Sequence, residues 1–295
     1  MSENEEDENG FDGLGEGPEG DEPMSFFDHV AELRTRLIRS AIGILAGFAL
    51  SFFFVREVMI FLRFPLEKAW NDASLPGTPD LQVLEIQGAL MTDIRLGIFG
   101  GIFVAAPIIF YQLWMFISPG LYKHEKAFVI PFVGTSVFMF ALGAGFAYMV
   151  VLPFAMQWLL SYPNSGWIAA LLLKYELGTS SRVIYQLELA NYVKGATRIM
   201  LAFGAVFEFP LVVAFLAKAG VVTHRMLLQY WKIAILVIFV VAAFLTPPEP
   251  VTQLMMALPM VILFFVSVGV AYVLNPAGRL PPPVVEDYED LEEDE

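Results

Sequence analysis

The stretch LAFGAVFEFPLVVAF, residues 201–215, is apolar throughout except for one charged residue, Glu208. The apolar run around it extends from Ile199 to Ala217. A membrane-spanning helix needs about 20 mostly apolar residues, so this run predicts a transmembrane helix. A carboxylate at mid-bilayer costs roughly 2.5–3.5 kcal/mol on insertion scales. Glu208 must therefore face a protein interior or a wet cavity, or be protonated.

The rest of the chain has the same apolar character. It is 57% hydrophobic and 16% charged, whereas soluble domains carry about 25% charged residues. The composition therefore predicts an all-α integral membrane protein. We expect six transmembrane helices, at about residues 37–55, 96–117, 128–152, 199–217, 227–245 and 252–272.

Proline and lysine set the expected ends of these helices. Pro153 is expected to end the third helix. In the fifth, Lys232 leaves an uncharged stretch from Ile233 to Leu245, which covers about 20 Å of a hydrocarbon core about 30 Å thick. We expect the fifth and sixth helices to be short, with a thinned membrane beside them.

Both ends of the chain are acidic. Residues 1–22 hold ten acidic residues and residues 286–295 hold eight, with no basic residue in either. The formal net charge of −14 comes from these tails, because the other 13 acidic residues are outnumbered by 17 Lys and Arg. Such composition predicts disordered tails at 1–23 and 276–295. They flank one membrane domain, residues 24–275.

Basic residues near the helix ends predict the orientation. They flank the first helix and occupy the loops after the second and fourth helices: Arg34, Arg36, Arg39, Lys123, Lys126, Lys218 and Arg225. The positive-inside rule then places both termini in the cytoplasm. The chain has no Cys and three scattered His, so we expect no disulfide, thiolate chemistry or metal site.

Four stretches, in order along the chain, resemble the TatC family, the multispanning component of the twin-arginine protein translocase. They are HVAELRTRL (29–37), YQLWMFISPGLYKHEK (111–126), FGAVFEFP (203–210) and LTPPEPVTQLMMALP (245–259). The resemblance covers about residues 24–275 and departs in the long segment between the third and fourth helices. It implies a curved, cupped set of six helices in the inner membrane of a prokaryotic cell.

The resemblance also implies a receptor and not an enzyme. Members of the family bind twin-arginine signal peptides on folded cargo and use the proton-motive force for export. The implied partners are TatB-like and TatA-like single-span proteins, further copies of the chain in a receptor complex, and the lipid bilayer. No cofactor and no nucleic acid are expected.

Two glutamates have both a local and a family interpretation. Glu125 can complement the N-terminus of the third helix, and Glu32 precedes Arg36 by four residues, the favourable spacing for an ion pair. The resemblance implies that both instead contact the arginines of a signal peptide, because a carboxylate and a guanidinium match in bidentate geometry. The other residues it implies at this site are Arg34, Arg36, Phe116, Pro119, Leu121, Tyr122, Lys123 and His124.

Further candidates lie deeper in the chain. The resemblance implies that Glu208 makes the concave face polar and hydrated, although a neutral, hydrogen-bonded structural glutamate is the alternative. It implies partner-helix docking at Thr246, Glu249 and Gln253, where ordinary helix-end polarity is the alternative. Structural roles are expected for Pro65, Pro210, Pro247 and Pro248. Close helix packing is expected at Gly97, Gly100, Gly101, Gly143 and Gly145.

Two other functional classes were weighed against the receptor. A proton-coupled transporter of a small solute also has an intramembrane carboxylate and proline breaks, but such proteins usually show internal repeats, which this sequence lacks. An intramembrane protease would need a motif for zinc or serine chemistry. HEKAF (124–128) lacks the second His of H-E-x-x-H, and G-x-S-x-G does not occur.

Overall fold

The computed structural model describes residues 26–117, 129–162, 186–246 and 249–275. Five of its helical segments are long and apolar enough to span a membrane, and a sixth, Trp231–Leu245, is shorter. The elements in chain order are α1 Phe26–Phe53, α2 Val55–Asp72, β1 Leu81–Gln82, α3 Gly88–Ile117, α4 Val129–Phe146, the π-helical turn η3 Ala147–Val151, α5 Leu152–Ser161, β2 Leu187–Glu188, α7 Leu189–Phe207, α8 Phe209–Lys218, α9 His224–Gln229, α10 Trp231–Leu245 and α11 Pro250–Leu274.

Several of the expected helix bounds are wrong. The first, second and fourth helices begin earlier than expected, at Phe26, Gly88 and Leu189. The third span does not end at Pro153 but continues through η3 and α5 to Ser161. Pro153 lies in the first turn of α5, a position where a missing N–H group is tolerated, and the π-helical turn before it absorbs the irregularity. The sixth helix, α11, is not short, since it has 25 residues. Of the last two spans only α10 is short, with 15 residues.

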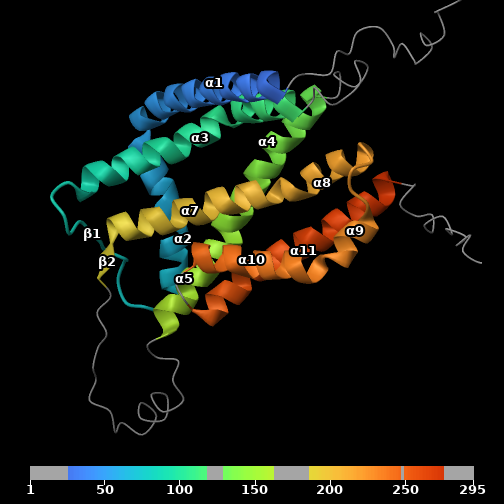
Figure 1. Ribbon diagram of the computed structural model, residues 1–295. Helices are drawn as coiled ribbons and strands as arrows, with labels where there is room; N and C mark the ends of the chain where they lie inside the picture. Colours follow the sequence, from blue (N-terminus) through green and yellow to red (C-terminus); the bar gives the residue numbers. More distant parts are fainter. Residues whose placement is uncertain (1–25, 118–128, 163–185, 247–248, 276–295) are drawn as a thin grey trace, which may run out of the picture.

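The helices form an open row and not a closed bundle. α1 packs mainly along α3, α4 packs on α3 and α7, and α11 packs on α8 and α10. Figure 1 shows α1 and α3 side by side along one edge, with α10 and α11 at the opposite edge. We call the end where α1 begins, α3 ends and α4 begins the N-terminal side, and the end where α10 meets α11 the hairpin side.

Glycines bring α1 and α3 into backbone contact. A Cβ atom added to Gly47 would lie 2.5 Å from the carbonyl oxygen of Gly101, and one added to Gly100 would lie 2.0 Å from Ser51 Oγ. Small residues at such positions allow membrane helices to approach closely. The close packing expected at Gly97, Gly100, Gly101 and Gly143 is confirmed, whereas the expectation for Gly145 is wrong, because a Cβ there would meet nothing within 4 Å.

A proline inside α2 is matched by two tyrosines from other helices. Pro65 has no N–H group, so the carbonyl of Phe61 loses its helical donor. The Tyr148 hydroxyl donates a hydrogen bond to Phe61 O at 2.8 Å, and the Tyr192 hydroxyl donates to Leu62 O at 2.5 Å. An unpaired carbonyl in apolar surroundings would cost free energy. These two bonds therefore fix α2 against η3 and α7.

The glycine contact yields a matched pair of substitutions. We expect Gly101→Ala to lower the free energy of unfolding by about 1–3 kcal/mol, because the added methyl group overpacks the interface. The new Cβ would lie 2.6 Å from the Phe48 backbone nitrogen. Gly145→Ala should leave stability unchanged or raise it slightly, since Ala favours helix more than Gly does. Thermal melting in detergent measures both, and equal losses would contradict the packing argument.

Candidate functional site

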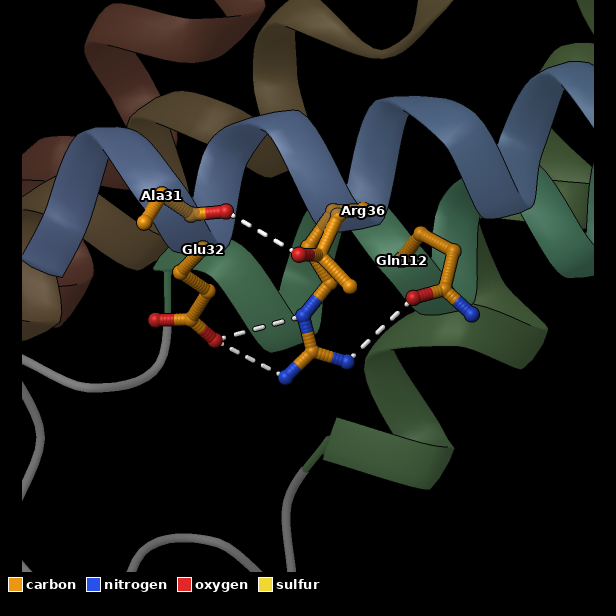
Figure 2. Close-up of polar contacts among 5 residues, drawn as sticks. Ala31, Glu32, Arg36 and Gln112 are labelled. Carbon is orange, nitrogen blue, oxygen red and sulfur yellow. Dashed lines mark hydrogen bonds and ion pairs between the residues drawn. The ribbon is translucent and has the colours of Figure 1, made fainter.

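A polar cluster joins α1 to α3 on the N-terminal side. Arg36 donates from Nε and Nη2 to Glu32 Oε1, at 3.2 and 2.8 Å, and from Nη1 to Gln112 Oε1 at 3.2 Å. Figure 2 shows Glu32 and Arg36 leaving the same side of α1, with Gln112 reaching Arg36 from α3. The ion pair expected from the spacing of Glu32 and Arg36 is confirmed.

Gln112 is a member of this cluster that the sequence analysis missed. Its side chain is buried, and it comes from the same YQLW segment that contributes to the family resemblance. The sequence does offer one indication of its role, because Gln112 is a lone amide in an otherwise apolar helix end. A buried amide needs a polar partner. Its partner could not be named from sequence, because the two helices are separated along the chain.

One oxygen of Glu32 remains uncommitted. Oε1 accepts two hydrogen bonds from Arg36, whereas Oε2 is buried and has no partner among the described residues. A carboxylate oxygen has two lone pairs, and an unpaired buried acceptor costs about 1–3 kcal/mol. The cluster can therefore accept a further hydrogen-bond donor, and a charged donor would be favoured.

An aromatic contact borders the cluster. The His29 ring of α1 stacks on the Phe116 ring of α3, with centroids 4.4 Å apart. Arg34 does not join the hydrogen bonds of Glu32 and Arg36. It is exposed and lines a shallow groove on α1 with Phe27 and Ile38.

Several expected site residues lie outside the described part of the chain: Pro119, Leu121, Tyr122, Lys123, His124, Glu125, Pro247 and Pro248. The first six belong to the connection between Ile117, where α3 ends, and Val129, where α4 begins. Both of those helix ends are on the N-terminal side. The connection therefore starts next to Phe116 and its stacking partner His29.

Glu208 lies where the fourth span is interrupted. It stands between α7 and α8, with Pro210 in the first turn of α8. Ser136 and Phe140 of α4 lie close to its carboxyl group, and Oε1 is buried without a partner among the described residues. Ser136 accepts a hydrogen bond from Trp114 Nε1 at 2.8 Å. Polar groups of three spans thus lie near one another at Trp114, Ser136 and Glu208, an arrangement that sequence reasoning missed.

A large pocket opens beside Glu208. It has a volume of about 510 Å³ and is lined by α7, α8, α10 and α11. Glu208 is the one ionisable residue among side chains that are otherwise apolar: Ala205, Val206, Phe209, Val212, Ala234, Val237, Ile238, Val241, Met260, Leu263 and Phe264. The pocket therefore offers an apolar surface with a single polar group.

The hairpin side carries a second polar arrangement. Thr246 Oγ1 donates to Ala242 O at 3.0 Å, and Gln253 Nε2 donates to Phe239 O at 3.1 Å. Glu249 Oε1 accepts a hydrogen bond from Trp158 Nε1 of α5, a contact the sequence analysis did not anticipate. Glu249 Oε2 is buried and has no partner within the described ranges. α5 therefore holds the start of α11 in place.

Metal binding finds no support in the described residues, where no three His, Asp or Glu side chains form a cluster that could hold an ion. The polar groups of the N-terminal side are suited to hydrogen bonding and ion pairing. Bond-making chemistry would need a nucleophile beside a general base, and Glu32, Arg36 and Gln112 do not supply that pair.

Comparison with known proteins gives a consistent relationship. The family profile described as Sec-independent protein translocase protein (TatC) matches residues 28–259. The TatC proteins of Desulforapulum autotrophicum and Helicobacter pylori strain J99 are 36% identical over 252 residues and 38% identical over 251 residues. These alignments cover 84% of both chains in the first case, and 85% of this chain and 90% of the relative in the second.

Solved structures agree with the sequence matches. A crystal structure described as the twin-arginine translocase receptor TatC superimposes with a TM-score of 0.69 and 34% identity. The superposition covers 83% of this chain and 99% of the solved one. A structure of such a receptor in the detergent DDM gives a TM-score of 0.67, also at 34% identity.

The bond between Trp158 and Glu249 generates a prediction about the hairpin side. Trp158→Phe removes the indole donor, so we expect amide hydrogen exchange in residues 249–253 to become faster by about tenfold, as expected for a lost hydrogen bond to a charged group. Glu249→Gln keeps an acceptor oxygen and should change exchange much less. Hydrogen-exchange mass spectrometry in detergent compares the two, and identical protection in all three proteins would contradict the assignment.

Proposed function

This chain belongs to the TatC family of Sec-independent protein translocase proteins, and we propose that its N-terminal side receives the arginines of signal peptides on exported cargo. It is the receptor component of the twin-arginine translocase, acts in Sec-independent protein export and is not an enzyme. Transport of a small solute, the alternative weighed from sequence, is set aside by this membership.

The observation that carries the proposal is the free oxygen of Glu32. Among the described residues Oε2 is buried and has no partner, beside an Arg36 guanidinium that already binds Oε1. A guest guanidinium that reaches Oε2 removes an unsatisfied acceptor and forms a charge-assisted bond. Arg36 and Gln112 then orient the carboxylate, while His29 and Phe116 form an apolar wall for the neighbouring peptide.

Glu125 is proposed to supply the second carboxylate. Its connection joins the end of α3, next to Phe116, to the start of α4. Two hydrogen bonds to charged groups contribute about 3–6 kcal/mol of binding free energy. This corresponds to dissociation constants between several millimolar and tens of micromolar. The apolar part of the signal peptide must add binding. The rim of the site is proposed to include Arg34, Pro119, Leu121, Tyr122, Lys123 and His124.

The membrane setting follows from the same proposal. The N-terminal side faces the cytoplasm, both termini with it, in the inner membrane of a prokaryotic cell. Support comes from the basic residues on that side, since cytoplasmic loops carry an excess of Lys and Arg. The open row of helices, with α1 and α11 at opposite edges, supports a curved, cupped receptor. The proton-motive force drives export, and several copies of the chain assemble in the receptor complex.

Partner helices are proposed to dock at the other edge of the molecule. The pocket beside Glu208 is apolar and open between α7, α8, α10 and α11, and within the described part of the chain Glu208 Oε1 has no hydrogen-bond partner. A TatB-like or TatA-like helix with one polar residue fits such a surface, for about 0.6–2 kcal/mol per interhelical hydrogen bond. Thr246, Glu249 and Gln253 would set the docking edge on the hairpin side.

Photo-cross-linking tests the arginine site. With a photoreactive amino acid at position 116, we expect the amount of cross-linked twin-arginine peptide to exceed that of a twin-lysine peptide by about tenfold or more. The reason is that Lys cannot form the bidentate pair. Glu32→Gln should remove most of that difference. Labelling from positions 32 and 125 shows only whether the peptide lies nearby, because the photoreactive residue there replaces a proposed contact. Equal labelling from position 116 by both peptides would refute the assignment.

Replacing Glu208 tests the pocket. We expect Glu208→Ala to reduce export and partner cross-linking severalfold, because it removes the polar contact offered to a partner helix. Glu208→Gln retains hydrogen bonding and should retain more of both activities. Cargo accumulation outside the cytoplasm and cross-linking from position 237 are the measurements. Wild-type values for both variants would defeat the proposal.

A further inference from the structure

An arginine of α7 lies at an unusual depth on the hairpin side. Arg198 belongs to the span Leu189–Lys218 and is nine residues beyond Leu189, where α7 begins, or about 14 Å along the helix. Its side chain is exposed and not buried among the helices. A guanidinium at such a depth is costly in intact hydrocarbon. The guanidinium therefore needs polar partners at this depth.

The described residues satisfy only part of the hydrogen-bonding capacity of this guanidinium. Nη1 of Arg198 donates to the carbonyl oxygen of Phe244 at 3.0 Å. Phe244 is in the last turn of α10, where carbonyl groups have no helical donor and the helix dipole favours a cation. An arginine has five N–H donors, and among the described residues no carboxylate forms an ion pair with Arg198, the two such pairs there being elsewhere.

The length of α10 explains why a polar group can reach this depth. Its 15 residues span about 22 Å, less than a hydrocarbon core of about 30 Å. A short span is accommodated by local thinning of the bilayer. The hydrogen bond to Phe244 places Arg198 level with the C-terminal end of α10. The headgroup layer of the thinned bilayer therefore lies at the depth of the guanidinium.

Neighbouring bases continue toward the membrane surface. Lys194 precedes Arg198 by one helical turn on the same face of α7 and is exposed. Arg95 of α3 reaches the first turn of α7, donating to Ala190 O at 3.4 Å. A phosphate drawn inward along α7 would therefore pass from one cation to the next, and the guanidinium of Arg198 matches its oxygens in bidentate geometry.

From this arrangement we propose that Arg198, with the exposed end of α10, binds the phosphate of a lipid headgroup on the hairpin side of the membrane. The bound lipid holds the headgroup layer at the level of Phe244. The end of α10, where Phe244 is exposed, then meets headgroups and water instead of acyl chains. The site is separate from Glu32 and does not depend on signal-peptide binding.

Lipid titration of the full-length protein tests the site. Delipidated protein in detergent is titrated with phosphatidylglycerol, and bound lipid is counted by native mass spectrometry. Arg198→Gln should weaken the tightest lipid by about tenfold, the loss expected for a charge-assisted hydrogen bond. Arg198→Lys keeps the positive charge but loses the bidentate geometry of the guanidinium, and it should weaken lipid binding less. Arg56→Gln, an exposed base at the start of α2, is the matched control and should leave it unchanged.

Two comparisons decide the outcome. The site would be overturned if both Arg198→Lys and Arg198→Gln bound the lipid with wild-type affinity. It would also be overturned if Arg56→Gln lost as much lipid affinity as Arg198→Gln. Because Arg198→Gln also removes the contact with Phe244, its thermal stability is measured, and if it does not fold, wild-type affinity in Arg198→Lys alone overturns the proposal. Glycerol phosphate at the same concentration should not displace the lipid. If it does, the site binds free phosphate and the lipid assignment is wrong.

Discussion

The backbone contact between α1 and α3 is the constraint on which the candidate receptor site depends. Gly47 and Gly101 leave no room for a Cβ atom between the helices. Arg36 precedes Gly47 by eleven residues, and Gln112 follows Gly101 by eleven residues, so an antiparallel register set at the glycines places these two polar side chains opposite each other. A helix pair held apart by larger residues would separate Glu32 and Arg36 from Gln112 and from Phe116.

Three carboxylates share an unusual property in this fold. Glu32, Glu208 and Glu249 each keep one carboxyl oxygen buried without a partner in the described structure. Most buried polar atoms are paired in native proteins. The three lie at different levels, on the N-terminal side, at the break of the fourth span and on the hairpin side. Each of these oxygens can therefore accept a further hydrogen bond.

Local sequence patterns could predict the spans and the local pairs, but not the contacts between distant helices. The apolar runs identified the six spans, and the spacing of Glu32 and Arg36 identified their ion pair. The end of the third span at Pro153 and the length of α11 were misjudged because hydropathy reports apolar extent, whereas caps and backbone bonds decide where a helix stops. Gln112, Ser136 and Trp158 act through partners on other helices, so their roles appear only when the register between helices is known.

The repair of α2 by two tyrosines has a consequence for the order of assembly in the membrane. The carbonyl of Phe61 accepts its hydrogen bond from a hydroxyl 87 residues further along the chain, and the carbonyl of Leu62 accepts one from a hydroxyl 130 residues away. During synthesis, the proline-containing helix therefore leaves the ribosome well before these hydroxyl groups. α2 can make both contacts only after the third span and the start of the fourth have been synthesised.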